Sequence, residues 1–125
     1  MNALYQDKDK KFQSYMLSTP AVNIAASDVY DARLTLDSSF SFEAHSLYAY
    51  CTGEDVTVEI EYNSNDKLTN GETYLQNIAI MNGKGDVRFF PFMVLPNSSV
   101  KIRLTNKGAS AVYVQLSFAG KRFVS

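Results

Sequence analysis

Apolar and polar residues alternate with a period of two along the last third of the chain. In residues 100–106, Val100, Ile102 and Leu104 fall on one face of an extended strand. After a turn at residues 107–110, the alternation resumes with one apolar face made of Val112, Val114, Leu116 and Phe118. Such alternation is typical of half-buried antiparallel strands. The fold class is therefore readable from this region.

The same alternation recurs earlier and predicts strands at five more segments: residues 30–36, 40–51, 56–62, 74–81 and 87–94. It loses contrast near residues 44–46, which predicts a β-bulge there. An Asn-Gly pair at 82–83 predicts a tight hairpin turn, because it supplies positive φ cheaply. Seven or eight short strands at this spacing indicate an antiparallel β-sandwich or barrel. Six mid-strand residues are expected between two sheets: Val58, Ile60, Ile102, Leu104, Val114 and Leu116.

Residues 1–27 fit neither the strand period nor the helix period over a useful length. Residues 7–11 carry mixed charge, and Pro20 ends any helix that begins before it. We expect an N-terminal arm or short helix over residues 1–27, followed by a β-sandwich domain over residues 28–125. The arm either lies on its own domain or packs on a neighbouring subunit. In the second case its apolar residues are the oligomer contacts: Leu4, Tyr5, Phe12, Tyr15, Met16 and Leu17.

Length and composition agree with one globular domain of 125 residues, in which 46% of the residues are hydrophobic. The single cysteine excludes an internal disulfide. The N-terminus shows no apolar signal-peptide region, and no apolar run reaches membrane-spanning length. We expect a chain that is made and folded in a cytoplasm and has no membrane partner.

Charge is distributed unevenly along the chain. All 13 acids and six of the 12 basic residues lie in residues 1–86, whereas residues 87–125 hold six basic residues and no acid. One interpretation is that the charges intersperse on folding, with Lys101 and Arg103 facing Glu59 and Glu61 across a sheet. The other is a basic face that meets an acidic face of another subunit or of a partner protein.

Two residues could carry nucleophilic or acid–base chemistry. His45 is the only histidine, and its Phe/Ala/Ser/Leu surroundings favour a strand residue over a general base. Cys51 has no adjacent base or cation, which favours a small core residue over a nucleophile. Because six residues separate them, a strand could bring both to one face.

Other polar groups lack the partners that a catalytic or metal site needs. Asn63, Asn65 and Asp66 supply oxygen ligands, but no glutamate follows at calcium-loop spacing. Residues 83–85 (Gly-Lys-Gly) are too short for a phosphate loop, and the paired Glu59 and Glu61 have no third group. A net charge of −1 and the lack of a recognition motif speak against nucleic-acid binding. We expect no enzymatic activity, no cofactor and no metal.

The last third of the chain also carries a resemblance. It combines an aromatic–proline bend at residues 89–92, a strand ending in Thr105-Asn106, and a last strand that closes on residues 120–123 (Gly-Lys-Arg-Phe). In these features it resembles the C-terminal half of small β-sandwich virion proteins of tailed bacteriophages, and the likeness extends over residues 30–123. The resemblance implies a jelly-roll-like structural subunit of the virion, on the capsid or as an accessory at the portal vertex or tail. It implies copies of itself and other virion proteins as partners, and no catalytic residues.

A carbohydrate-binding module is the alternative. Sandwich modules of that kind present aromatic rings on a flat or concave face, and five of the eight tyrosines could serve: Tyr48, Tyr50, Tyr62, Tyr74 and Tyr113. The absence of tryptophan argues against it.

Overall fold

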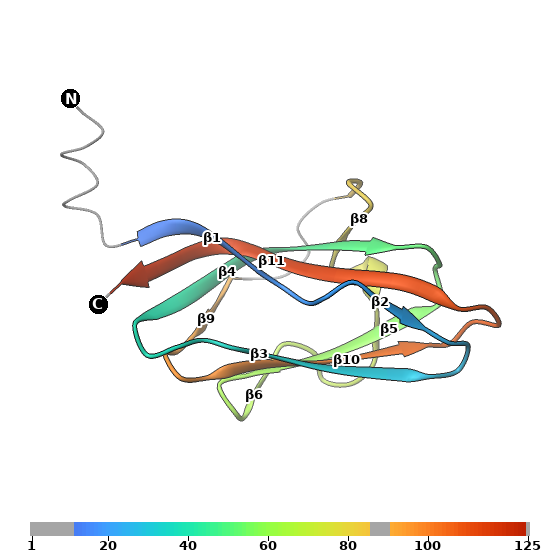
Figure 1. The fold of residues 1–125 in the computed structure, drawn as a ribbon, viewed down its shortest axis with the longest axis horizontal. Coiled ribbons are helices and arrows are strands. Elements are labelled where there is room, and N and C mark those ends of the chain that lie inside the picture. Colours follow the sequence, from blue (N-terminus) through green and yellow to red (C-terminus); the bar gives the residue numbers. More distant parts are fainter. Residues whose placement is uncertain (1–11, 86–90, 125) are drawn as a thin grey trace.

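Two β-sheets packed face to face form the computed structural model, which describes residues 12–85 and 91–124 (Figure 1). Sheet A contains β1 (Phe12–Ser18), β2 (Val22–Ile24), β4 (Phe40–Cys51), β8 (Ile80–Met81), β9 (Phe92–Val94) and β11 (Val112–Val124). Sheet B contains β3 (Val29–Thr35), β5 (Val56–Tyr62), β6 (Asp66–Lys67), β7 (Thr73–Tyr74) and β10 (Ser99–Asn106). The predicted all-β antiparallel sandwich is confirmed.

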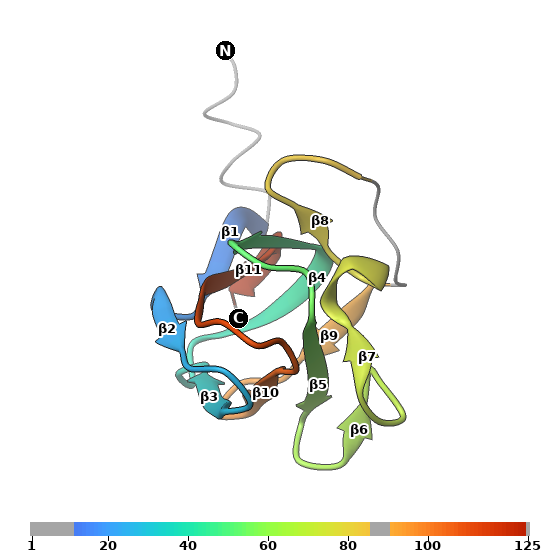
Figure 2. The same ribbon diagram turned by 90° about the vertical axis from the view of Figure 1, so that its right-hand side faces the viewer.

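From β3 onward, the strands of three or more residues alternate between the two sheets. β3 in sheet B is followed by β4 in sheet A and β5 in sheet B, and β10 in sheet B is followed by β11 in sheet A (Figures 1 and 2). The described pairings are antiparallel except for the two-residue contact of β4 with β8. Eight of the described strands are three or more residues long. This arrangement agrees with the jelly-roll-like sandwich of seven to eight strands expected from the sequence.

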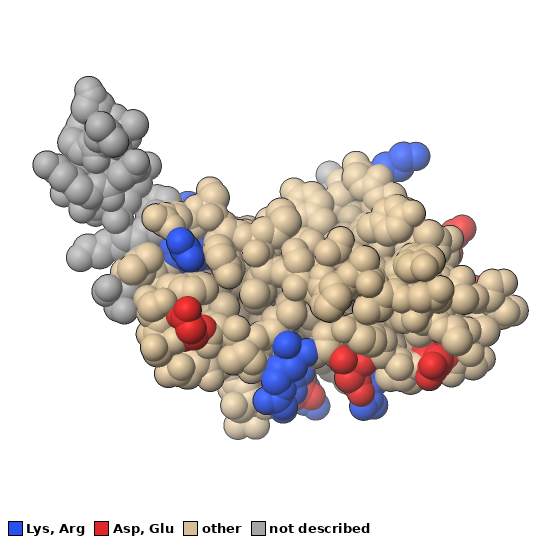
Figure 3. All heavy atoms as spheres, viewed as in Figure 1, with Lys and Arg blue, Asp and Glu red and all other residues tan. Residues whose placement is uncertain are grey.

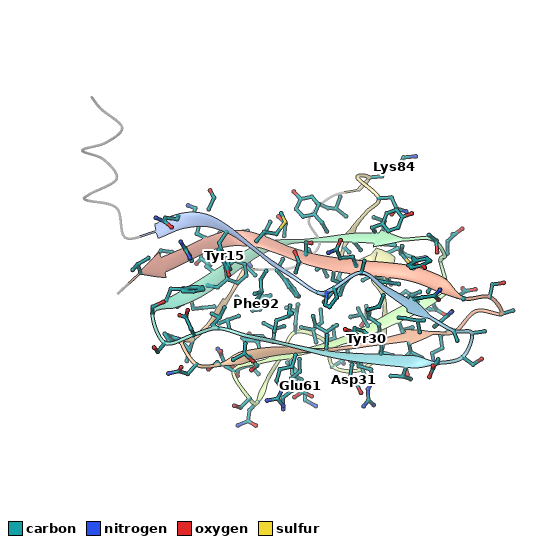
Figure 4. All side chains as sticks on the ribbon, in the orientation of Figure 1. Tyr15, Tyr30, Asp31, Glu61, Lys84 and Phe92 are labelled. Atoms are coloured by element: carbon teal, nitrogen blue, oxygen red, sulfur yellow. The ribbon has the colours of Figure 1, made fainter. Side chains whose placement is uncertain are left out.

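The core lies where the alternation placed it. All six predicted core residues are at most 1% exposed. Ile102 lies opposite Ile60, and Leu104 lies opposite Val58, so β10 and β5 share one apolar face. Phe92 points between the sheets (Figure 4), with its ring centroid 5.8 Å from that of Phe118 in sheet A and 4.5 Å from that of Tyr62 in sheet B. These contacts join the two sheets into one packed unit.

The longest ladder joins β4 to β11, and it contains the expected bulge. Ser46 lies opposite Ala119 and Ala44 lies opposite Gly120, so His45 is the extra residue on β4. Gly120 fits this position because an added Cβ would overlap the carbonyl oxygen of Glu43. The bulge therefore depends on a close backbone approach that only glycine permits.

The N-terminal segment differs from the expected arm or short helix. From Phe12 it forms β1, which pairs along β11 to Ser18, and β2 then pairs with the same strand. Tyr15 and Leu17 pack against the core, while Ser14, Met16 and Ser18 point outward, so the strand period is present over a short length. Residues 12–18 and 22–24 thus pair with β11 of sheet A, and the predicted division of the chain between residues 27 and 28 stays a prediction. Leu4 and Tyr5 lie outside the described residues.

The predicted strand over residues 74–81 is also different. The segment is a short 3-10 helix, η1 (Leu75–Asn77), between the two-residue strands β7 and β8. Leu75, Ile78 and Ala79 have the i, i+3, i+4 spacing of one helical face, and Leu75 is fully buried. The predicted strand over residues 87–94 is described only from Pro91, and β9 begins just after that proline.

Candidate interaction surface

The outer face of sheet A carries three exposed tyrosines, which we name the tyrosine face: Tyr48, Tyr50 and Tyr113. Their exposed fractions are 41%, 58% and 55%. The two on β4 alternate with buried Leu47, Ala49 and Cys51, because successive side chains of a strand point to opposite faces.

The three rings lie on neighbouring strands. Gln115 of β11 lies opposite Tyr50, and Tyr113 precedes Gln115 by two residues. Tyr113 is therefore the diagonal neighbour of Tyr50, at a separation that aromatic side chains can bridge. Exposed Met16 of β1 lies opposite Ala119 on the same face, farther along β11. The result is a group of three tyrosine rings on two neighbouring strands, with exposed Met16 on the same face of the sheet but two strands away from β4.

Polar side chains beside the tyrosine face are already hydrogen-bonded within the chain. The Gln115 side-chain amide donates to the carbonyl oxygen of Thr19 at 2.9 Å. The Thr52 hydroxyl accepts from the backbone N–H of Tyr113 at 2.9 Å, and the hydroxyls of Ser18 and Ser117 bond to each other at 2.8 Å. The groups that remain for a ligand are chiefly the aromatic rings and their hydroxyls.

Sheet B has the opposite character. Lysine, arginine, aspartate and glutamate gather along its outer side (Figure 3), and Asp31 and Glu61 point away from the core (Figure 4). Lys101 lies opposite Glu61, and Arg103 lies opposite Glu59. The charges of the two chain regions therefore intersperse on folding, as the first interpretation of the charge distribution expected.

An open hollow of about 420 Å³ lies on this charged face. The Arg103 guanidinium donates two hydrogen bonds to the Asp31 carboxylate, at 2.8 and 3.2 Å. These bonds lower the pKa of Asp31 and raise that of Arg103. The charged residues around the hollow have both signs: Asp31, Arg33, Glu59, Glu61, Lys101 and Arg103.

His45 and Cys51 do not form a catalytic pair. Both lie on β4, and six residues of extended strand separate them by about 20 Å. His45 Nε2 lies 2.7 Å from Glu43 Oε1, next to the bulge. Cys51 is buried in the core, and burial raises the pKa of its thiol, which disfavours the reactive thiolate.

Asn63, the first residue after β5, ties the end of that strand to the backbone at the end of β9, and we call such a side chain a clamp. Its side-chain amide donates to the carbonyl oxygen of Met93 at 2.8 Å, and its oxygen accepts from the N–H of Leu95 at 2.9 Å. Asn82 makes the same kind of two-way contact with the backbone of Cys51. Sequence reasoning missed these roles, because the backbone groups that the two asparagines bind lie 30 to 32 residues away in the sequence.

Buried Asn106 is a third clamp, and it joins the sheets. Its amide nitrogen donates to the carbonyl oxygens of Ile24, Ala25 and Ser110, and its oxygen accepts from the N–H of Gly108. This one side chain holds together β10, the end of β2 and the turn that follows β10.

The predicted oligomer contacts that lie in the described residues divide into three groups. Tyr15 and Leu17 pack within their own chain, and Tyr15 lies edge-on to Phe40 and Phe42 at 5.2 and 5.6 Å. Met16 is 55% exposed and remains a candidate contact. For Phe12 the structure describes only the backbone.

No group of three or more His, Cys, Asp or Glu side chains in residues 12–85 and 91–124 is arranged to hold a metal ion. A helix of membrane-spanning length and hydropathy is not found in the described part of the chain.

The chain was compared with known proteins. No family model matches it, and no curated protein matches it. One similar solved structure is PliG of Salmonella Typhimurium, a periplasmic lysozyme inhibitor of g-type lysozyme. It has a TM-score of 0.38 and 7% sequence identity, and the match covers 88% of each chain. This likeness is too weak to carry a function to our chain.

The expected localisation in a virion is corrected, because the similar solved structure named above is a periplasmic protein. We assign no compartment in its place. The resemblance to bacteriophage virion proteins stays an untested interpretation of the sequence.

Proposed function

We propose that this chain is a non-enzymatic, self-associating β-sandwich subunit that makes protein contacts through the tyrosine face of sheet A. The observation that carries the proposal is the exposure of Tyr48, Tyr50 and Tyr113 on one face of two adjacent strands. Tyrosine and methionine are enriched in protein interfaces, where a ring adds much contact area at little entropic cost.

Size supports this reading. About half of the surface of each tyrosine residue is exposed, so the three together present on the order of 300 Å². A patch of that size is comparable to the largest apolar patch of an ordinary monomer, which is often functional. With Met16 included, the face supplies the centre of an interface, and polar neighbours supply its rim.

Carbohydrate binding is the second candidate, and the same three rings favour it. A sugar site also needs polar groups that orient the hydroxyls of the ligand. The polar side chains of Gln115, Ser117 and Thr52 already have partners within the chain. This difference favours a protein partner over a glycan.

Two of the five tyrosines considered for carbohydrate binding lie elsewhere. Tyr62 packs on Phe92 inside the sandwich. Tyr74 is 45% exposed but belongs to β7 in sheet B, so it is not part of the tyrosine face.

The test combines mass measurement with a glycan screen. The full chain and a variant with Tyr48, Tyr50 and Tyr113 all changed to serine are compared by sedimentation equilibrium over a concentration series. We expect the variant to keep its circular dichroism and melting temperature but to form a smaller assembly. Tyr74→Ser is the matched control, and it should change nothing.

An unchanged assembly in the triple variant would refute the proposal. Selective binding of the wild-type chain to a glycan array, lost in the triple variant, would establish the carbohydrate reading instead.

A further inference from the structure

Strand β3 forms an open edge of sheet B. The order of the sheet is β3-β10-β5-β6, so in the described chain β3 pairs on one side only. Figures 1 and 2 show it at the margin of the sheet. A seven-residue edge strand is a template for pairing with another strand unless the fold blocks it.

Backbone groups of alternate β3 residues point to this open edge. The N–H of Leu36 donates to the carbonyl of Ser98, and the N–H of Asn106 donates to the carbonyl of Asp28. Both bonds continue the β3–β10 register, so even-numbered residues of β3 direct their N–H and C=O groups to β10. The odd-numbered residues then direct theirs outward: Val29, Asp31, Arg33 and Thr35.

One of these outward groups is already capped. The N–H of Val29 donates to the carboxylate of Asp28 at 2.9 Å, which confirms that it points away from β10. The groups of Asp31, Arg33 and Thr35 have no strand partner among the described residues.

The sequence of β3 is complementary to itself about Ala32. In an antiparallel pair of two β3 strands centred there, Asp31 lies opposite Arg33 of the second copy, and Arg33 lies opposite its Asp31. Both positions direct backbone groups to the open edge, as a hydrogen-bonded antiparallel pair requires. On the inner side, half-buried Tyr30 lies opposite Leu34 of the second copy and extends the core.

Arg33 would gain an ion-pair partner from this pairing. Within its own sheet it lies opposite Lys101, a like charge, whereas Asp31 lies opposite Arg103 and binds it. In residues 12–85 and 91–124, Arg33 forms no ion pair. A carboxylate from the second copy would supply the partner that the charge pattern lacks, because opposite charges across a sheet are stabilising and like charges are not.

We propose that two copies of this chain form a two-fold symmetric dimer by antiparallel pairing of their β3 strands about Ala32. The pairing joins two sheets B into one continuous sheet and leaves the tyrosine face free. It shares with the proposed function only the premise of self-association, since the two surfaces lie on different sheets.

Charge reversal tests the dimer. Arg33→Asp alone and Asp31→Arg alone each place like charges across the two-fold axis, and each should raise the dimer dissociation constant about tenfold. The double variant with both changes restores opposite charges and should restore the dimer. Sedimentation equilibrium over a concentration series measures the constant, and melting curves show that each variant is folded. Failure of the double variant to restore the dimer would overturn the pairing.

Cross-linking gives a second readout. Ala32 faces its own copy across the axis at the short Cα separation of a non-hydrogen-bonded pair, which a disulfide can span. In a Cys51→Ala background, Ala32→Cys should form a disulfide-linked dimer under mild oxidation. Lys101→Cys, exposed on the central strand of the same sheet, should not.

A wild-type chain that stays monomeric over the whole concentration range would refute the dimer. So would a dimer that tolerates both single reversals. The tyrosine variants keep this dimer if the inference is correct, so loss of either surface is distinguishable from loss of the other.

Discussion

Replacing Asn106 with alanine removes the side chain that ties three backbone segments together at one end of the sandwich. The residue is 1% exposed, at the end of β10. Its amide nitrogen donates to the carbonyl oxygens of Ile24 at 3.1 Å, Ala25 at 3.3 Å and Ser110 at 2.8 Å. Its oxygen accepts from the N–H of Gly108 at 2.9 Å.

The expected loss follows from these bonds. The amide carries two hydrogens, which the three carbonyls share, so the side chain contributes three full bonds when the accepted one is included. Each bond contributes about 1 kcal/mol net, and buried carbonyls left unpaired add a further cost. Asn106→Ala should therefore lower the free energy of unfolding by roughly 2–4 kcal/mol. For a chain of this size that corresponds to a fall in Tm of about 8–15 °C.

Denaturant titration and thermal melting check this magnitude. Asn23→Ala is the matched control, because Asn23 is exposed on β2 next to the tied segment and should change stability by less than about 0.5 kcal/mol. At neutral pH, Asn106→Asp should lower the free energy of unfolding more than Asn106→Ala does, because it places a carboxylate oxygen next to the carbonyl oxygens that the amide now binds. If Asn106→Ala matches the control, the clamp does not contribute to stability and the reasoning fails.

Three further predictions concern the core, the bulge and the thiol. Leu104→Ala and Leu116→Ala should each lower the free energy of unfolding by about 2–5 kcal/mol, because both are fully buried; unchanged urea midpoints would contradict the core assignment. Gly120→Ala should destabilise by at least about 1–3 kcal/mol, because its Cβ would overlap a backbone carbonyl, whereas Gly71→Ala, with open space around it, should be neutral by melting. Burial raises the pKa of Cys51, so the unfolded state loses its thiol proton first. Stability should then fall as pH rises above about 8.5, and Cys51→Ala should remove that part of the pH dependence in urea titrations.

Alternation predicted the long strands because each has one face in the core and one in water. β4 and β5 begin and end at the predicted residues, and β3 is displaced by one residue. The bulge was also readable, since the change of face at Ala44-His45-Ser46 breaks the alternation on the strand itself. A period-two pattern in the sequence therefore indicates both which side chains of a strand face the core and where a β-bulge interrupts that order.

Short segments were not predictable in this way. β1 buries only Tyr15 and Leu17 beside exposed Met16, too few positions to reveal a period. Its place in the fold comes from pairing with β11, more than ninety residues away in sequence. The Asn106 clamp is equally non-local, because the carbonyls that it binds belong to the end of β2.

The tyrosine face needed the structure for a related reason. The sequence shows that Tyr48 and Tyr50 share a face of one strand, but not that this face points to water or that Tyr113 lies beside them. Only the ladder between β4 and β11 brings the three rings together. Candidate binding residues on different strands can be selected from sequence by type, and the pairing of the strands then decides which of them act as one surface.

The uneven charge along the chain shows how topology and function connect. The C-terminal region has no acid, yet its strand β10 lies between β3 and β5, which carry Asp31, Glu59 and Glu61. The basic strand β10 lies between β5, which carries two acids, and β3, which carries one acid and one base, so the charges at the centre of sheet B balance. The pattern is incomplete only at the edge, where Arg33 of β3 faces Lys101. Residues 12–85 and 91–124 supply no acidic partner for Arg33. An edge strand has one side left to pair, and a second β3 offers Asp31 at the matching position.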